Sequence, residues 1–505
     1  MKTLRRSILL ALLFAFAPAA LPQSLPNLPL ARLYYTVRKR TVNPQGEMKE
    51  KVDANDRALA EATRIGNIGE VRRLLAKGMT LLSDQPWTDV LDFGNSLALR
   101  SDRAFVDTSK TYSVRLEQIY TPSIALERSL AAHVTLRKPP AGRGGAPGEV
   151  VKDFGTFDEV SRDLRESPYL MELDLSSVPD GSYFVHAEVM DGTRPLGSAS
   201  MRVVAKNNLD AALATLEAMS KSAPESLRAE VLYPADYIHN VNRGRIDIGQ
   251  FDVTKEIRDA GEIAMAGKDG KDPFASQHGD IRRHYFFKEA GEIMPYRVFV
   301  PSSYNGSKAF PLIVALHGLG GSEASMFGQN YAMLDPAEKH GYIVVAPMGY
   351  RVDGFYGRTP DRRSQLSEKD VMNVLAIARK DYKIDPDRIY LMGHSMGGIG
   401  TWTLGAKHPE IWAALGPISG VADPRTVEAM RHIPEIVVHG DADTTVPVSG
   451  SRDMVAEMKR LGTDVKYIEV PGGSHTSVPG PNMAAIFDFF DTHKKQGSSP
   501  SAQQR

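Results

Sequence analysis

The sequence predicts an α/β protein, with a mostly parallel sheet covered by helices on both faces, preceded by a helical segment and a small β-sandwich. Three observations predict this fold class. From near Arg282 to about Lys494, short apolar runs alternate with helical patterns, as in a parallel sheet covered on both faces. Between about Tyr112 and Ala205, apolar and polar residues alternate, as in half-buried strands. From Glu47 to Lys77, apolar residues recur at three- and four-residue steps, which indicates helices.

Length and composition narrow the class of protein. A chain of 505 residues indicates several domains, and 42% hydrophobic with 24% charged residues is typical of globular proteins rather than disordered ones. Because 61 basic residues balance 61 acidic ones, we expect no nucleic-acid partner. The chain has no cysteine, which excludes disulfides, thiolate metal sites and a cysteine nucleophile. Covalent catalysis would therefore need Ser, Thr, Lys or a carboxylate.

The N-terminus has the layout of a secretory signal peptide. Lys2, Arg5 and Arg6 precede an apolar run from Ile8 to Phe16, and small residues follow as cleavage sites. The alternative is a membrane anchor, but the run is short for the roughly 20 apolar residues that a span needs. We therefore expect cleavage near residue 20, a periplasmic or secreted protein, and no stable membrane span in the mature chain.

The chain up to the α/β domain divides into three further segments. Residues 21–105 should be helical, and Ala60 to Gly78 resembles one ankyrin-type helix pair; since no second copy follows, a helical hairpin is favoured. Residues 106–206 should form an immunoglobulin-like β-sandwich, with Pro139 to Gly148 as an exposed loop. Residues 207–281 should be a mostly helical linker region that ends in the polar stretch Gly267 to Pro273.

The α/β domain should span 282–495, with a disordered tail at 496–505. Five apolar runs are expected to be its strands: Leu312 to Leu316, Ile343 to Ala346, Ile389 to Met392, Ile436 to Val438 and Tyr467 to Val470. In open α/β sheets, the loops that follow such strands carry the functional residues.

The strongest motif is the G-x-S-x-G run from Gly393 to Gly397, which lies between a predicted strand and a helix-compatible stretch. A sharp strand-to-helix turn strains the serine backbone, and side chains two residues to either side would collide with neighbouring chain. The turn would present the hydroxyl of Ser395 clear of the sheet. The helix N-terminus behind it favours developing negative charge.

A serine hydroxyl needs a base, and the base needs a carboxylate that orients it. We assign His475, in the Gly-rich loop after the strand ending at Val470, as the base. Asp443, after the strand ending at Val438, is our carboxylate, and Asp441 is the alternative. Three other histidines are interpreted as structural rather than basic: His317, His394 and His439.

A tetrahedral intermediate needs two backbone donors for its oxyanion. One should be the N–H of Met396, the residue after the nucleophile. The other should come from the loop His317 to Gly321, which follows an earlier strand, with Leu319 as first choice and Gly320 as second.

At the level of family, residues 294–490 resemble the α/β-hydrolase superfamily. The resemblance is carried by the runs PYRVFVPSSY, HGLGG, DYKIDPDRIYLMGHSMGG, HGDADTTVP and GGSH. These runs are similar to those of secreted esterases of the feruloyl-esterase and polyhydroxybutyrate-depolymerase type. They are also similar to those of prolyl-oligopeptidase-like hydrolases. The resemblance implies Ser395, Asp443 and His475 as a catalytic triad. An immunoglobulin-like domain ahead of such a domain also resembles bacterial esterases, whereas a lid and a cysteine framework are missing.

The sequence therefore predicts a secreted serine hydrolase that cleaves carboxylic esters, either small molecules or polymers, without cofactor or metal. The alternatives are a serine peptidase of prolyl-oligopeptidase type and a surface binding protein with an inactive hydrolase domain. The oligomeric state stays open. Tyr350, Phe355, Tyr356 and Trp402 are candidates to line an acyl or aromatic pocket, although core packing is at least as good an interpretation of Trp402 and of Trp412. Arg358, Arg362 and Arg363 are candidates to bind a carboxylate or a sugar acid, but a solvated face is the favoured interpretation of these three.

Overall fold

The computed structural model describes residues 28–141, 148–249 and 251–495. The expected signal peptide at 1–20 and the expected tail at 496–505 lie outside the described residues, as does most of the expected loop between Pro139 and Gly148. The chain divides into two compact units. One contains residues 1–216 and 237–259, and the other contains 217–236 and 260–505.

The first unit begins with four helices, α1 (Leu28–Val42), α2 (Gly46–Arg64), α3 (Ile68–Leu81) and α4 (Asp89–Ser96). The α2–α3 pair is the expected helical hairpin. Its turn ends where the side chain of Asn67 accepts a hydrogen bond from the Glu70 amide and so caps α3. The inward apolar residues, among them Val52, Val71 and Leu75, share one small core with α1.

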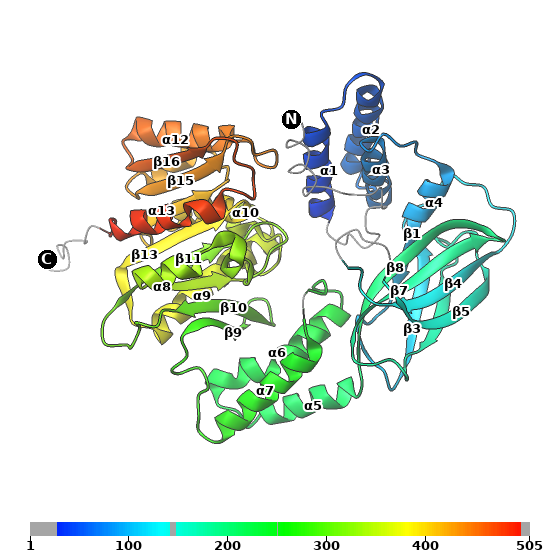
Figure 1. Cartoon of the computed structure of the whole chain (residues 1–505), viewed down its shortest axis with the longest axis horizontal. Helices are drawn as coiled ribbons and strands as arrows, with labels where there is room; N and C mark the ends of the chain where they lie inside the picture. Colours follow the sequence, from blue (N-terminus) through cyan, green and yellow to red (C-terminus); the bar gives the residue numbers. More distant parts are fainter. Residues whose placement is uncertain (1–27, 142–147, 250, 496–505) are drawn as a thin grey trace, which may run out of the picture. The chain divides into compact units, whose positions relative to one another are not determined.

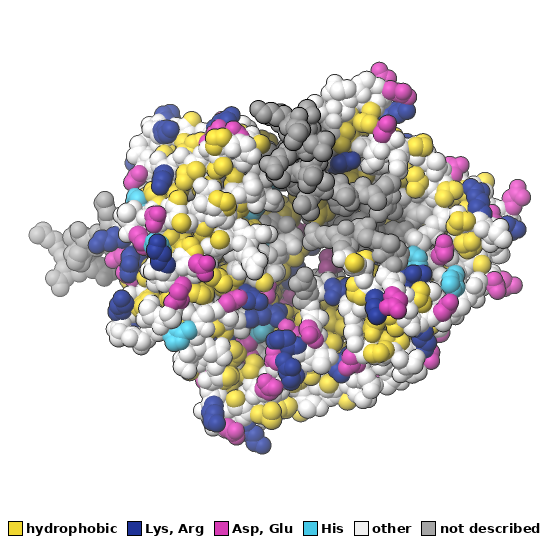
Figure 2. Space-filling view, in the orientation of Figure 1, with side chains coloured by type: hydrophobic (Ala, Val, Ile, Leu, Met, Phe, Trp, Pro, Cys, Tyr) yellow, Lys and Arg dark blue, Asp and Glu magenta, His cyan; other side chains and the backbone are white. Residues whose placement is uncertain are grey.

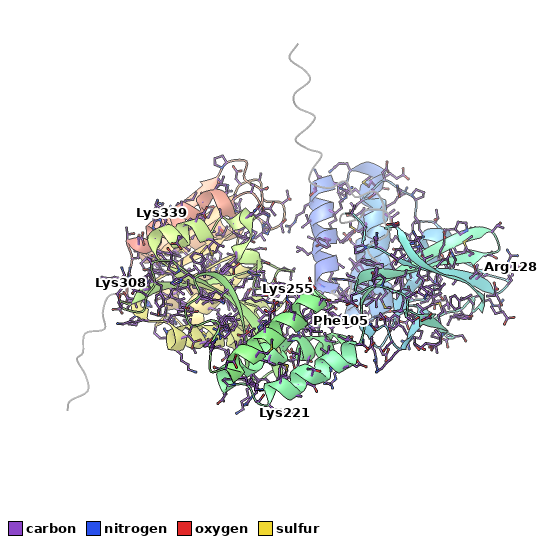
Figure 3. All side chains as sticks on the ribbon, turned by 60° about the horizontal axis from the view of Figure 1, so that its bottom comes forward. Phe105, Arg128, Lys221, Lys255, Lys308 and Lys339 are labelled. Atoms are coloured by element: carbon purple, nitrogen blue, oxygen red, sulfur yellow. The ribbon has the colours of Figure 1, made fainter. Side chains whose placement is uncertain are left out.

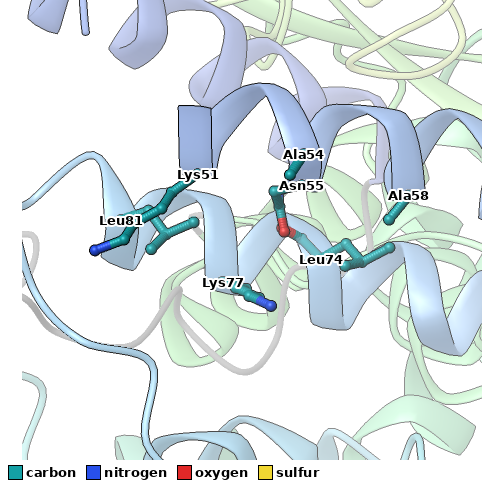
Figure 4. Close-up of a pocket in the computed structure, with 7 residues that line it drawn as sticks. All are labelled: Lys51, Ala54, Asn55, Ala58, Leu74, Lys77 and Leu81. Carbon is teal, nitrogen blue, oxygen red and sulfur yellow. The ribbon is translucent and has the colours of Figure 1, made fainter. Parts of the chain in front are cut away.

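A small apolar pocket lies between α2 and α3 (Figure 4). Its lining residues are Lys51, Ala54, Asn55, Ala58, Leu74, Lys77 and Leu81. The side-chain amide of Asn55 donates a hydrogen bond to the carbonyl of Leu74, which ties the two helices together at its floor. The lining offers no hydroxyl, carboxylate or imidazole. Its ionisable residues are Lys51 and Lys77, and Lys51 forms an ion pair with Glu47.

Two sheets follow in the same unit (Figure 1). The three-stranded sheet has the order β1 (Leu97–Arg100), β3 (Thr111–Gln118), β6 (Tyr169–Asp174). The five-stranded sheet has the order β2 (Phe105–Asp107), β8 (Arg194–Lys206), β7 (Gly181–Asp191), β4 (Leu130–Arg137), β5 (Val150–Val160). All pairs are antiparallel except β2 with β8.

The two sheets share one hydrophobic core. In β7 the expected alternation is confirmed, because Tyr183, Val185, Ala187 and Val189 are buried while their neighbours are more exposed. Residues of β3 and β6 contribute to the same core, among them Val114 and Leu173. The immunoglobulin-like assignment of this region stays a prediction.

The sheets begin before the expected boundary at residue 106. Strand β1 lies within the segment expected to be helical, and its Leu97 pairs with Gln118 of β3. Because Leu97, Ala98 and Leu99 are all buried, this strand carries no alternation that the sequence could have shown. Phe105, labelled in Figure 3, is the first residue of β2. Its ring packs edge-on against the rings of Tyr237 and Phe251.

Three helices, α5 (Leu209–Ser220), α6 (Glu225–Asn242) and α7 (Val253–Lys268), confirm the helical pattern expected after residue 207. Within the second unit, Glu230 of α6 is buried and holds strand β9 (Gly279–Phe287). Its carboxylate accepts from Arg283 Nε at 2.7 Å and lies 2.5 Å from His284 Nδ1. This buried ion pair anchors the N-terminal part of α6 to the sheet edge.

The second unit is built on an eight-stranded sheet of order β16–β15–β14–β13–β11–β12–β10–β9. Its strands after β9 are β10 (Glu292–Val300), β11 (Phe310–Leu316), β12 (Ile343–Pro347), β13 (Ile384–His394), β14 (Ala414–Ile418), β15 (Glu435–Gly440) and β16 (Val465–Val470). All pairs are parallel except β9 with β10 and β10 with β12. The five expected strands are present, and the predicted mostly parallel sheet is confirmed.

Helices cover both faces of this sheet (Figure 1). One face packs a core that includes Leu312, Leu375 and Trp402 against α9 (Arg362–Asp381), α10 (Met396–Lys407), α11 (Val427–Met430) and α12 (Ser449–Leu461). The other face packs Ile313 and Phe487 between the sheet, α8 (Leu334–His340) and α13 (Pro479–Asp491). The architecture is the one expected of an α/β-hydrolase fold.

Strand β14 was not predicted, because its sequence ALGPI contains Gly416 and Pro417, which normally indicate a turn. Gly416 packs tightly, since a Cβ there would lie 3.0 Å from the ring of Phe490. The antiparallel strands β9 and β10 were also missed as strands, although PYRVFV falls within β10.

The surface agrees with the neutral composition. On the face shown in Figure 2, basic and acidic side chains are interspersed rather than gathered by sign. None of the helices in the described part of the chain is long and apolar enough to cross a membrane.

One buried carboxyl group, that of Glu435, makes the stability of this sheet depend on pH. Glu435 opens β15, and its Oε2 accepts a hydrogen bond from Trp402 Nε1 at 2.8 Å. Burial raises the pKa of Glu435 from 4.5 to about 8 despite that hydrogen bond. Since the folded chain holds this proton more tightly than the unfolded chain, the stability it gives is complete below the unfolded pKa and is lost as the pH rises through 8.

We therefore expect Glu435→Gln, which keeps an acceptor for Trp402 but cannot ionise, to raise the melting temperature more at about pH 9 than at about pH 5. Thermal unfolding of both proteins at the two pH values measures this difference. Exposed Glu410→Gln serves as the control and should show no such dependence. An equal effect of Glu435→Gln at both pH values would contradict the account.

Candidate active site

Ser395 sits at the turn between β13 and α10, with φ 59° and ψ −116°. This left-handed backbone is strained for a residue with a side chain and is held by its surroundings. A Cβ on Gly397 would lie 2.0 Å from the carbonyl oxygen of Leu316, and one on Gly393 would lie 2.5 Å from the carbonyl oxygen of Gly397. The glycines at both ends of the motif are therefore a steric requirement of the turn.

His475 lies between Ser395 and Asp443. Its Nε2 is 2.9 Å from Ser395 Oγ, and its Nδ1 is 2.6 Å from Asp443 Oδ2. With an ionised Asp443, the network assigns the proton to Nδ1, so that Nε2 accepts from the serine hydroxyl. In this arrangement the imidazole can take the proton of the hydroxyl as Oγ attacks an electrophile.

The loops that carry Asp443 and His475 meet at a close backbone contact. A Cβ on Gly440, at the end of β15, would lie 2.1 Å from the carbonyl oxygen of Gly473. The amide of Ala442 donates to the same carbonyl at 3.1 Å. This approach lets Asp443 reach His475 across 32 residues of chain.

Asp443 is nine-tenths buried and well supplied with donors. Burial alone would raise its pKa, but hydrogen bonds from His439 and His475, with the amide of Val446, outweigh it and hold the pKa of Asp443 well below its ordinary value. The amides of Thr445 and Val446 donate to Oδ1 at 2.8 and 2.9 Å. The carboxylate is therefore ionised at any pH at which a serine and a histidine could react.

His439 is a second contact of this carboxylate that the sequence did not reveal. It is fully buried, as expected, but its Nε2 lies 3.3 Å from Asp443 Oδ2 and 3.0 Å from the carbonyl of Val446. Its Nδ1 lies 2.7 Å from the hydroxyl of Ser451. His439 therefore helps to fix the orientation of Asp443 as well as to fill the core.

The alternative acid, Asp441, has a different place. Its Oδ1 accepts a hydrogen bond from the Gly472 amide at 2.7 Å, and so it caps the turn ahead of His475. Of the two candidate carboxylates, Asp443 is the one that contacts His475.

His394, next to Ser395, forms a hydrogen bond with the backbone of His475. Burial first, and the neighbouring His475 second, lower the pKa of His394 to about 3, so its ring is neutral. Its Nε2 lies 2.8 Å from the carbonyl of His475, and the hydroxyl of Tyr331 lies 3.0 Å from its Nδ1. The neutral ring therefore donates to the backbone of His475 and accepts from Tyr331. Tyr331 was not among the expected residues.

The loop after β11 lies directly against the serine, because a Cβ on Gly318 would be 3.4 Å from Ser395 Cβ. Within the described residues, neither the N–H of Leu319 nor that of Met396, the first residue of α10, donates to a backbone carbonyl. The N–H of Gly320 instead donates to the carbonyl of Val352 at 2.8 Å. Gly320, the second choice from sequence, is therefore occupied, while Leu319 and Met396 are available as donors.

The residues predicted to line a pocket differ in their exposure. Trp402 and Tyr356 are fully buried, and Trp402 is an α10 residue that contributes to the core on one face of the sheet. Tyr350 and Phe355 are half-buried, while Arg358 and Arg362 are exposed. Arg363 is paired with Asp353 at 2.6 Å. The described residues also hold no group of three His, Asp or Glu side chains suited to a metal ion.

Comparison with known proteins connects this site with esterases. Residues 288–477 match the family model described as "Putative esterase". "Putative esterase NocK" of Nocardia uniformis subsp. tsuyamanensis is 27% identical over 183 residues, 35% of this chain and 52% of the relative. "Feruloyl esterase B" of Talaromyces funiculosus is 27% identical over 27% of this chain and 38% of its own length.

A third relative is the "Bifunctional acetylxylan esterase/xylanase XynS20E" of Neocallimastix patriciarum, 30% identical over 31% of this chain and 22% of the relative. The crystal structure of a thermostable esterase aligns with 79% of this chain and 98% of its own length at 19% identity and a TM-score of 0.37. The chain spans about half or less of the length of these curated relatives. The matched segment contains Ser395, Asp443 and His475.

Because Asp443 and Asp441 make different contacts, we expect their substitution to have different effects on activity. Asp443→Asn should lower the turnover of p-nitrophenyl acetate by about 10⁴-fold, because an amide beside Nδ1 no longer stabilises the protonated imidazole. Asp441→Asn keeps an acceptor for the Gly472 amide and should stay within a few-fold of wild type. Steady-state kinetics of both variants test the assignment, and a reversed order of the two losses would refute it.

Proposed function

We propose that this protein is a serine hydrolase that cleaves carboxylic esters through an acyl-enzyme on Ser395. One observation carries the proposal: the continuous hydrogen-bond chain from Ser395 Oγ through His475 to an ionised Asp443. The match of residues 288–477 to an esterase family supports a carboxylic ester hydrolase in particular.

In the first half of the reaction, His475 Nε2 takes the hydroxyl proton while Ser395 Oγ attacks the ester carbonyl. The carbonyl oxygen becomes an oxyanion, and the amides of Met396 and Leu319 are the donors that we assign to it. The C–O bond to the alcohol then breaks, and the imidazolium gives its proton to the leaving alkoxide. Ser395 is left as an acyl ester.

In the second half, a water takes the place of the alcohol. His475 accepts its proton as the water oxygen attacks the acyl carbonyl, and the same two amides hold the second oxyanion. When this intermediate collapses, the imidazolium returns its proton to Ser395 Oγ and the carboxylic acid leaves. Asp443 stays ionised throughout and stabilises the positive charge on His475.

We further propose residues 282–495 as the catalytic domain and 106–206 as an immunoglobulin-like module without catalytic residues. The layout of residues 1–20 supports export to the periplasm or the medium. The names of the relatives, feruloyl esterase and acetylxylan esterase, make feruloyl esters and acetylated xylan the substrates to test first.

Ser395→Ala should reduce kcat/KM for p-nitrophenyl acetate and p-nitrophenyl butyrate by about 10⁴- to 10⁶-fold, because it removes the nucleophile. Ser419→Ala is the control, since Ser419 is a buried serine that directly follows the neighbouring strand β14, and the two ring nitrogens of His475 bond to Asp443 and Ser395 instead. Ester turnover that survives Ser395→Ala would overturn the mechanism.

A substrate panel tests the chemistry of the bond. Wild type should hydrolyse p-nitrophenyl esters, methyl ferulate and acetylated xylan oligosaccharides in preference to a Gly-Pro p-nitroanilide. Turnover of the peptide substrate alone would replace the esterase with a prolyl-oligopeptidase-type peptidase. No turnover of any substrate would favour a binding protein.

A further inference from the structure

The segment from Met348 to Gly357, which follows β12, braces the loop His317 to Gly321 at three points. The carbonyl of Met348 lies 2.8 Å from His317 Nε2. The carbonyl of Val352 accepts from the Gly320 amide at 2.8 Å, and the hydroxyl of Tyr356 donates to the carbonyl of His317 at 3.0 Å. These contacts surround Leu319, the residue whose amide we assign to the oxyanion.

Tyr356 is the contact that also reaches the nucleophile helix. Its side chain is fully buried, and a Cβ on Gly400 of α10 would lie 2.4 Å from its ring. A Cβ on Gly349 would lie 2.7 Å from the same ring, so two glycines make the slot that holds it. The ring meets that of His317 edge-on, with centroids 5.9 Å apart. Burial raises the pKa of Tyr356 well above its ordinary value, so the phenol keeps its proton as a donor.

The backbone of this segment is strained, which indicates that its shape is imposed. Tyr350, Phe355 and Tyr356 have φ of 63°, 54° and 49°, in the left-handed region that residues with side chains avoid. Helix α9 holds two of these positions. The hydroxyl of Ser367 accepts from the Tyr356 amide at 3.1 Å, and Asp370 accepts from the Tyr350 amide at 2.9 Å.

A buried ion pair fixes the same segment to the sheet. Arg351 Nη2 lies 2.9 Å from both carboxylate oxygens of Glu292 in β10, and both side chains are largely buried. The guanidinium also stacks on the ring of Tyr350, 3.9 Å from its centroid. Arg351 is therefore anchored immediately beside Val352, whose carbonyl holds Gly320.

We propose that Tyr356 is a positioning residue for the oxyanion hole: its hydroxyl fixes the His317 carbonyl while its ring fills the slot against α10, so that the amides of Leu319 and Met396 stay aimed at one point. This inference rests on the proposed function. It predicts a defect in stabilising the transition state rather than in binding the ester.

The test is Tyr356→Phe, which removes one hydroxyl and keeps the ring. We expect kcat for p-nitrophenyl acetate to fall about 10-fold with KM nearly unchanged, because a displaced donor weakens only interactions made in the transition state. The affinity for a boronic acid, which forms a tetrahedral adduct on the serine, should fall by the same factor. Hydrogen exchange of a peptide covering 317–321 should become faster.

The matched control is Tyr390→Phe. Tyr390 is also fully buried in the same unit, and its hydroxyl donates to the carbonyl of His493 at 2.6 Å, away from Ser395. A similar loss of melting temperature with unchanged kcat is expected of this control. If the two variants lose equal stability and neither changes kcat or boronate affinity, Tyr356 is only a packing residue and the inference is overturned.

A second variant covers the case in which Tyr356→Phe does not fold. Arg351→Lys keeps the positive charge but loses the hydrogen bond from Nη1 to the Tyr350 carbonyl and the planar stacking on the Tyr350 ring, and it should show the same kcat defect with unchanged KM. Unchanged kcat in that variant would equally contradict the proposal that the segment Met348 to Gly357 positions the loop His317 to Gly321. A wild type that turns over no ester would instead overturn the proposed function, and the inference with it.

Discussion

The site depends on close backbone contacts at the carboxyl ends of neighbouring strands, which only glycines allow. At Gly397 there is no room for a single carbon beside the Leu316 carbonyl, and at Gly440 there is none beside the Gly473 carbonyl. The first contact fixes the turn at Ser395 against the start of the loop His317 to Gly321. The second fixes the loop that carries Asp443 against the loop that carries His475. Hydrogen-bond distances of 2.6 and 2.9 Å along the chain of three residues follow from these two approaches.

Within that geometry, the surroundings of Asp443 and His394 determine which of these two side chains is charged. Asp443 stays charged although it is buried, because two imidazoles and two backbone amides surround it. His394 stays neutral although it stands next to His475, because it is buried and beside another imidazole. A second positive charge at that place would oppose the protonation of His475 during the reaction. The neutral ring serves instead as a donor to the His475 backbone.

Much of the fold could be predicted because its sequence patterns are local. An apolar run before Gly393 indicated the strand that leads to Ser395, and the alternation around Val185 indicated β7. Strand β14 could not be predicted, since Gly416 and Pro417 look like a turn and only their packing reveals a strand. Strand β1 could not be predicted either, because its first three residues are all buried and so show no alternation of apolar and polar residues.

The site shows the same limit. Strand, loop and chain order were enough to single out Ser395, Asp443 and His475. The contact of His439 with Asp443 and the capture of the Gly320 amide by Val352 depend on how distant segments meet, which no spacing in the sequence reports. Tyr356 was singled out for a pocket and instead lies buried behind the loop that it braces.

The central claim is that Ser395 becomes covalently acylated, and mass spectrometry tests it most directly. The full-length protein would be treated with a fluorophosphonate, digested, and the modified residue located. The account predicts stoichiometric labelling of Ser395 in wild type and in Asp441→Asn, and strongly slowed labelling in His475→Ala. A label on another residue, or no label on active wild-type enzyme, would contradict it.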